Sequence, residues 1–275
     1  MSRVQVLGLL RFSYPSIYNG RGQGDEFAAY QQSLYEPARL QRRVLWFEHV
    51  VLPSLRNQID KDFKCVLLVG DQLPEPYRTQ LLNLVDTVPQ ITLAMEPEGQ
   101  RHRKTVVDLM AKHSDPDADI VAEFQLDDDD GVGSKFVKQT RFYYDLVAPM
   151  MRADRRVTLD FCSGVMLRLD AQGVDIKPVQ ARLWTPALVT YRPPDARTVL
   201  RTISHLDLWQ HMPTLSLVEP VMFVRGAHED NVSQLSKRWD RFRADIYNPD
   251  EMLALLQNDF GIDLEAMENA RASLG

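Results

Sequence analysis

Short apolar segments alternate with amphipathic ones along the first half of the chain. The apolar runs have no strict alternation, as in strands that are buried on both faces of a sheet. The segments between them place apolar residues at three- and four-residue spacing, which predicts helices. The predicted strands are 4–10, 63–69, 91–95 and 120–126, and the predicted helices are 39–58, 74–85 and 101–113. This order predicts a parallel sheet with helices on both faces and functional loops at the carboxyl ends of the strands.

The second half of the chain is less regular. It predicts helices over 136–150 and 198–212, strands over 157–169, 174–191 and 221–224, and an acidic helical tail over 249–270. In the tail, Leu253, Leu256, Phe260 and Leu264 form an apolar stripe that predicts docking onto the rest of the protein. We therefore expect one domain over residues 1–235 and a C-terminal helical extension over 236–275 that packs on it.

Composition narrows the class of protein. Hydrophobic residues make up 44% of the 275 residues and charged residues 25%, which is typical of a globular protein. The net charge of −6 argues against a nucleic-acid binder, and residues 250–275 alone carry −5 of it. No apolar run is long enough to span a membrane, and the first ten residues do not resemble a signal peptide. With only two cysteines, the chain is expected in the reducing cytoplasm.

Four consecutive aspartates, Asp127 to Asp130, follow directly after the apolar run 120–126. Adjacent carboxylates repel one another unless a counter-charge is present, and Mg²⁺ and Mn²⁺ prefer such oxygen ligands. Because side chains alternate in an extended segment, Asp127 and Asp129 are expected on one side. The alternative is a solvated acidic turn in which Asp130 caps the next helix.

An apolar strand that ends in Asp-x-Asp resembles the glycosyltransferases of the A fold (GT-A). The order of elements over residues 1 to about 235 is similar, and "FEHVVLPSLRNQIDKDF", "QLDDDD" and "VRGAHEDNVS" resemble the rhamnosyltransferase family of bacteria. The resemblance implies an α/β GT-A fold with a mixed central sheet flanked by helices. It also implies metal-dependent transfer of a sugar, rhamnose by resemblance, from a nucleotide-sugar to a glycan or small-molecule acceptor, with inversion.

The same resemblance assigns roles to individual residues. The metal, Mn²⁺ or Mg²⁺, is expected on Asp127, Asp129, Asp130 and His228, and Asp127 also contacts the ribose. Contacts with the nucleotide are expected from Arg11, Asp71, Arg101, Arg103 and Lys104. For Asp71 the alternative is a simple turn residue, for the three cations it is a solvated helix start, and for His228 it is a structural role.

Inversion requires a base that takes the proton of the acceptor hydroxyl. In "TISHLDLW" the first choice is Asp207 and the second is His205. The Glu-Asp pair usual at this helix is absent, so a helix cap or a surface charge remains an alternative for both residues.

Two other classes of protein also fit parts of the sequence. Asp128-Asp129-Asp130-Gly131-Val132 matches the nucleophile loop of haloacid-dehalogenase-type phosphatases, with Asp128 as nucleophile and Mg²⁺ beside it. That motif normally ends the first strand of its sheet, whereas here it follows three predicted strands. A non-enzymatic acidic cation-binding module is the second alternative, although the spaced ligands and central glycine of a calcium loop are absent.

Overall fold

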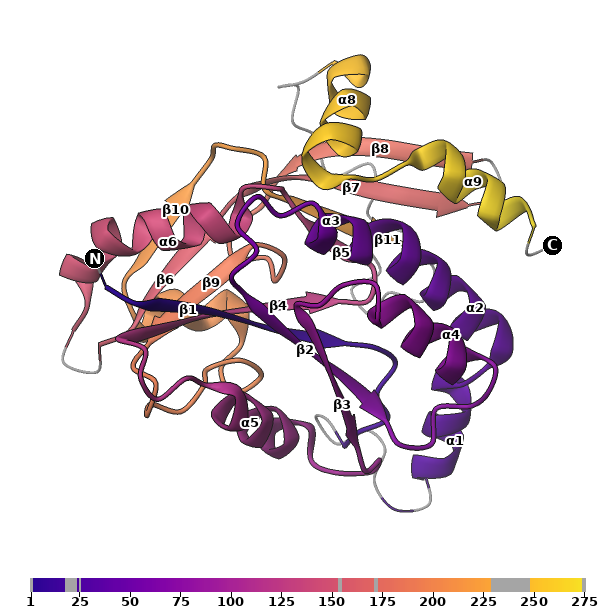
Figure 1. Cartoon of the computed structure of the whole chain (residues 1–275), viewed down its shortest axis with the longest axis horizontal. Helices are drawn as coiled ribbons and strands as arrows, with labels where there is room; N and C mark the ends of the chain where they lie inside the picture. The colour runs from indigo at the N-terminus through magenta and orange to yellow at the C-terminus, as the bar shows by residue number, and fades with distance from the viewer. Residues whose placement is uncertain are drawn as a thin grey trace.

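The computed structural model describes residues 2–17, 24, 26–152, 155–170, 173–228 and 248–273. Its centre is a seven-stranded sheet with the order β10-β6-β9-β4-β1-β2-β3 (Figure 1). The strands are β1 (Val4–Arg11), β2 (Lys64–Gly70), β3 (Ile91–Glu96), β4 (Ile120–Asp127), β6 (Val157–Phe161), β9 (Leu188–Arg192) and β10 (Thr214–Leu217). Strands β3, β2, β1 and β4 are mutually parallel, and β9 runs antiparallel to β4 and β6. The expected mixed central sheet is thus confirmed.

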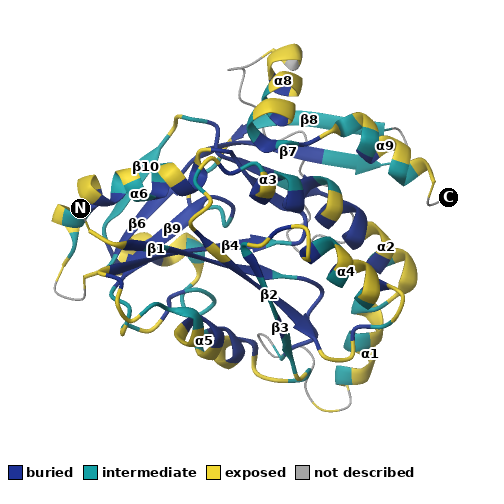
Figure 2. Cartoon of the chain, in the orientation of Figure 1, coloured by how far each residue is buried: buried dark blue, intermediate teal, exposed yellow. Residues whose placement is uncertain are grey.

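Helices cover both faces of this sheet, as the alternating pattern predicts. The helical segments of the first half are α1 (Glu26–Leu34), α2 (Pro37–Trp46), the π-helical turn η1 (Phe47–Val51), α3 (Leu52–Arg56), α4 (Tyr77–Val85) and α5 (His102–His113). Helix α6 (Phe136–Val147) and the short η2 (Ala148–Met150) follow the short strand β5 (Asp130–Val132). Helices α2, α4 and α6 share one apolar core with the sheet, and α5 shares a separate core with its opposite face. Figure 2 shows the central strands buried between exposed helix faces.

A second, four-stranded sheet has the order β5-β11-β7-β8. Its strands are β5 (Asp130–Val132), β7 (Ser163–Asp170), β8 (Gly173–Gln180) and β11 (Phe223–Ala227). Strand β5 pairs antiparallel with β11, so the aspartate loop joins the end of β4 in the first sheet to the start of β5 in the second. Asp130 therefore begins a strand, and the alternative of a helix cap is wrong.

Two long strands expected in the second half are each divided. The segment 157–169 splits at Cys162 into β6 and β7, because the chain passes there from one sheet to the other. The segment 174–191 splits into β8 and β9 around a loop in which Leu183 and Ala187 adopt positive φ. The helix expected over 198–212 is reduced to η3 (His205–Asp207) and α7 (Leu208–His211).

The C-terminal segment forms two helices, α8 (Pro249–Phe260) and α9 (Leu264–Ala272), which lie over the second sheet (Figure 1). Gly261 separates them in the left-handed conformation that favours glycine, with φ of 70°. Leu256 and Phe260 are buried against residues of η1 and β7, as the predicted stripe requires, but Leu253 is 47% exposed. The expected boundary between 235 and 236 lies outside the described residues.

No helix in the described part of the chain is long and apolar enough to cross a membrane.

Candidate functional site

The aspartate loop lies at the carboxyl end of β4, beside the end of β1. Asp127 pairs in register with Arg11, and Asp128, Asp129 and Asp130 are all at most 5% exposed. Burial raises the pKa of Asp128 and, together with the neighbouring Asp129 carboxylate, raises the pKa of Asp130 well above its usual range. The loop is therefore not a solvated acidic turn, because three of its four carboxylates are withdrawn from water.

Arginines from distant segments supply positive charge to this loop. Arg11 Nη2 lies 2.9 Å and Arg201 Nη2 lies 3.1 Å from Asp127 Oδ1. Although burial opposes them, these guanidinium groups hold the pKa of Asp127 below its usual range. Asp127 is thus an ionised carboxylate at neutral pH that is held by two cations.

Arg43 of α2 is the most deeply buried of these cations. Its Nη1 lies 2.6 Å from Asp128 Oδ1 and 3.3 Å from Asp129 Oδ2, and the Arg43 side chain is 7% exposed. This contact turns the Asp128 carboxylate toward the protein interior. The geometry does not present Asp128 to a substrate as a nucleophile.

His228 approaches the loop from the end of β11. Its Nε2 lies 2.7 Å from Asp129 Oδ2, and its ring packs on Trp46 at a centroid distance of 5.6 Å. The close approach depends on Gly226, where a Cβ atom would lie 2.8 Å from the carbonyl oxygen of Asp129. The N–H of Gly226 donates to that same oxygen at 3.0 Å. Glycine is therefore required for β11 to bring His228 onto Asp129.

Asp129 and His228 are the residues best placed to hold a metal ion. Two neighbouring ligand atoms on one Mg²⁺ or Mn²⁺ lie about 3 Å apart, since each bond is about 2.1 Å long. Asp129 Oδ2 and His228 Nε2 lie 2.7 Å apart in a hydrogen bond, a distance close to this spacing, and imidazole and carboxylate suit Mn²⁺. No group of three potential ligands occurs among the described residues. The structure gives Asp127 arginine partners and gives Asp130 Oδ2 the backbone N–H of Asp127 at 3.3 Å.

A cavity of about 640 Å³ lies near this loop: none of the four aspartates lines it, but Arg201, which contacts Asp127, does. The cationic side chains of Arg101, Arg103 and Arg201 line it. Gln125 of β4 also lines it; this residue is 3% exposed and its Nε2 has no hydrogen-bond partner among the described residues. A buried donor without a partner is costly, so this amide is positioned to bind a ligand oxygen.

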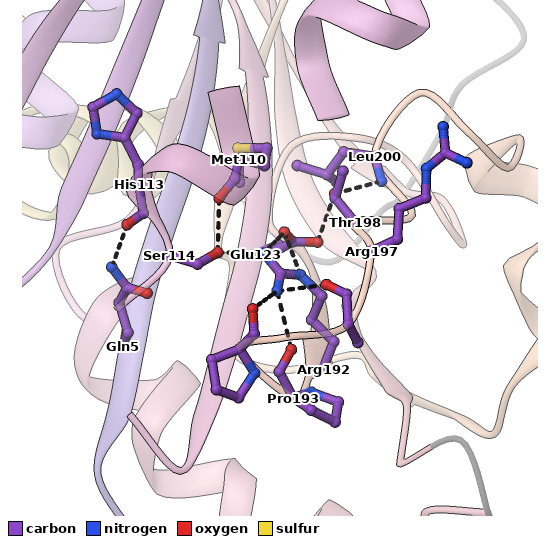
Figure 3. A network of polar contacts seen from close by, with 12 residues as sticks. Gln5, Met110, His113, Ser114, Glu123, Arg192, Pro193, Arg197, Thr198 and Leu200 are labelled. Carbon is purple, nitrogen blue, oxygen red and sulfur yellow. Dashed lines mark hydrogen bonds and ion pairs between the residues drawn. The ribbon is translucent and has the colours of Figure 1, made fainter. Parts of the chain in front are cut away.

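The buried ion pair between Arg192 and Glu123 holds the segment that leads to Arg201 in place (Figure 3). Arg192 Nε donates to Glu123 Oε1 at 2.6 Å, and Thr198 Oγ1 donates to Glu123 Oε2 at 2.7 Å. Arg192 Nη1 also donates to three backbone carbonyls of the following turn, those of Pro193, Pro194 and Ala196. This network holds residues 193–200 on the sheet, and Arg201 follows it with φ of 57°.

The two candidates for the base differ in their surroundings. His205 lines the cavity, and its Nδ1 lies 2.5 Å from the carbonyl oxygen of Leu183. Burial, and to a smaller extent Arg225 and Arg201, lower the pKa of His205, so its imidazole is neutral at pH 7. Asp207 is exposed, does not line the cavity, and accepts a hydrogen bond from Gln210 at 3.3 Å. The geometry favours His205.

The remaining nucleotide-contacting candidates are divided by the structure. Arg101 and Arg103 line the cavity at the start of α5. Lys104 does not; it points to the exposed side of α5, where its Nζ lies 2.6 Å from Asp108 Oδ2. Asp71 is exposed in the turn after β2, and its N–H donates to the carbonyl of Glu96.

Acidification is expected to destabilise the fold through His102, the first residue of α5. Burial, and next the charge of Arg11, lower its pKa to about 3, whereas an unfolded histidine has a pKa of about 6.5. Below pH 6.5 the unfolded state binds the additional proton, so the free energy of unfolding falls by up to about 1.4 kcal/mol per pH unit. In His102→Gln this contribution to the pH dependence of the free energy of unfolding should be absent. Urea unfolding between pH 7 and 4.5 measures it. Parallel curves for both proteins would contradict the assignment.

Comparison with known proteins gives a family and several distant structures. The chain matches the family model described as "Putative rhamnosyl transferase" over residues 5–238. S. aureus TarS 1-349 is 11% identical, covering 92% of this chain and 70% of that chain, with a TM-score of 0.45. The structure of TarS 1-349 in complex with UDP-GlcNAc is 9% identical, covering 92% of this chain and 64% of that chain, with a TM-score of 0.47. A "putative nucleotide-diphospho-sugar transferase from Desulfovibrio desulfuricans G20" is 14% identical, covering 98% of each chain, with a TM-score of 0.36. No curated protein matches.

Proposed function

Because the chain belongs to the rhamnosyl transferase family, we propose that it transfers a sugar, rhamnose by family, from a nucleotide-sugar donor to an acceptor hydroxyl. The observation that carries the proposal is the cavity of about 640 Å³ beside the aspartate loop, with three arginines and a neutral histidine in its lining. Its volume is in the range of small-molecule sites, about 300 to 1,000 Å³.

The donor diphosphate is assigned to the arginine side of the cavity. Guanidinium groups bind phosphate oxygens through paired, charge-assisted hydrogen bonds, and Arg101, Arg103 and Arg201 all reach this space. Arg201 also contacts Asp127, so a bound diphosphate would lie next to the aspartate loop. The amide of Gln125 supplies a further donor to an uncharged oxygen of the donor or acceptor.

Metal dependence is part of this proposal, with Asp129 and His228 as the residues that would hold Mn²⁺ or Mg²⁺. Such an ion, when bound, stabilises negative charge on the departing diphosphate. The chain contributes the same kind of stabilisation through Arg11 and Arg201, which lie at the Asp127 end of the loop.

We assign the proton transfer to His205. The acceptor oxygen attacks the anomeric carbon, the bond from that carbon to the diphosphate oxygen breaks, and the hydroxyl proton passes to His205 Nε2. Burial lowers the pKa of His205, so its imidazole is neutral and Nε2 can accept a proton. Attack from the side opposite the leaving group inverts the anomeric carbon.

The test is binding of nucleoside diphosphates followed by thermal unfolding, with and without Mn²⁺. Ligand that binds only the folded state stabilises it by about 2.7 kcal/mol at a hundredfold excess over Kd, so one diphosphate should raise Tm by several degrees. Asp129→Asn should abolish the Mn²⁺-dependent part of this increase, and Lys104→Met, outside the cavity, should leave it unchanged. Release of phosphate from an aryl phosphate without any nucleotide-dependent stabilisation would overturn the proposal.

A further inference from the structure

A carboxylate outside the aspartate loop is buried close to the cavity. Asp160 of β6 is fully buried and accepts three hydrogen bonds. Oδ1 accepts from the N–H of Leu183 at 3.0 Å, and Oδ2 accepts from Ser216 Oγ at 2.9 Å and from Cys162 Sγ at 3.3 Å. A carboxylate is costly to bury, and these three donors offset that cost.

The bond to Leu183 fixes an unusual backbone conformation. Leu183 has φ of 58°, a left-handed geometry that costs a non-glycine residue on the order of 1 kcal/mol. Its side chain is buried in a small apolar cluster with Leu188, Val199 and Leu208, which together with Asp160 holds it in place. The Leu183 carbonyl is then directed at Nδ1 of His205.

That carbonyl determines which nitrogen of His205 carries the proton. A carbonyl oxygen only accepts hydrogen bonds, so neutral His205 must carry its proton on Nδ1 to donate to Leu183. Nε2 then keeps its lone pair, which is the form that a base requires. Because His205 lines the cavity, the contact with Leu183 also fixes the orientation of its ring there.

We propose that Asp160 is a positioning residue for the transfer reaction. Through the N–H and carbonyl of Leu183, it holds His205 as the Nδ1–H tautomer with Nε2 available to the acceptor hydroxyl. The inference rests on the proposed role of His205 as the base, but it makes a statement about the His205 ring that is measurable without activity.

The experiment compares Asp160→Ala with Asp160→Asn. Alanine removes the acceptor of the Leu183 N–H, whereas the Oδ1 of asparagine preserves it. Nitrogen-15 NMR of histidine-labelled protein reports the tautomer, and His205→Gln identifies the signal among the six histidines. Thr158→Val is the matched control, because Thr158 is fully buried on the same side of β6 and its Oγ1 has no partner among the described residues.

We expect the Nδ1–H tautomer in the wild type, Asp160→Asn and Thr158→Val, and a mixture of tautomers in Asp160→Ala. In the transfer assay, kcat of Asp160→Ala should fall at least tenfold with KM for the donor within about twofold, and Asp160→Asn should restore it. An Nε2–H tautomer in the wild type overturns the inference even if Asp160→Ala does not fold. An unchanged tautomer in folded Asp160→Ala overturns it as well. Full activity of His205→Gln would instead show that His205 is not the base. The NMR result would still decide whether Asp160 sets the tautomer of His205.

Discussion

His205→Gln should lower kcat for sugar transfer by roughly 10²- to 10⁴-fold, the usual contribution of a general base. Glutamine is of similar size and keeps an amide donor, but it has no nitrogen that takes up a proton. Nucleoside-diphosphate affinity should remain within about twofold, because the arginines of the cavity are unchanged. A coupled assay of diphosphate release, together with equilibrium binding, separates the two effects.

The pH profile gives a second test of the same residue. A base must be neutral, and burial lowers the pKa of His205, so the wild-type rate should be lost only at a pH below the ordinary histidine value of about 6.5. The fall in rate at low pH that comes from protonation of His205 should be absent in His205→Gln. Asp207→Asn serves as the control and should retain near-wild-type kcat, since Asp207 is exposed and outside the cavity. Loss of activity in Asp207→Asn with retention in His205→Gln would assign the base to Asp207.

The parallel half of the fold follows from the sequence because its signals are local. Strand β4 is buried along its length with Ile120, Ala122, Phe124 and Leu126 on one face, and α5 shows a helical period, so both are predicted within one or two residues. The later strands are not, because their ends depend on contacts with distant segments. Nothing within residues 157–169 reveals that the chain changes sheets at Cys162, whose N–H donates to the Leu217 carbonyl of β10.

The candidate site shows the same division. The aspartates are recognisable because they are adjacent and follow a strand, and His228 because a motif surrounds it. Arg43 and Arg201 have no such signal, since one lies in an ordinary basic helix and the other in a loop; only the fold places them on Asp127, Asp128 and Asp129. The sequence indicates that the four carboxylates require a counter-charge. It does not reveal that arginines supply much of that charge.

Arg43→Met should destabilise the protein by about 3–5 kcal/mol at pH 7, the cost of leaving buried carboxylates without their cation. Arg43 lies 2.6 Å from Asp128 Oδ1 and 3.3 Å from Asp129 Oδ2, with all three side chains at most 7% exposed. Methionine preserves much of the apolar stem but not the charge. Urea unfolding measures the difference, and Gln41→Met, at an exposed position on the same helix, should change stability by no more than about 0.5 kcal/mol.

The stability lost in Arg43→Met should also depend on pH and on whether Asp128 is still present. Arg43 stabilises ionised carboxylates, so protonation of Asp128, whose pKa is raised chiefly by burial, removes the interaction. The difference between wild type and Arg43→Met should therefore shrink as the pH falls from 7 toward 4. The double variant Arg43→Met/Asp128→Asn should recover part of the lost stability, because the amide needs no counter-charge. A deficit that is constant with pH and strictly additive in the double variant would show that Arg43 acts through packing, and that the positive charge stabilising the aspartate loop comes instead from Arg11 and Arg201.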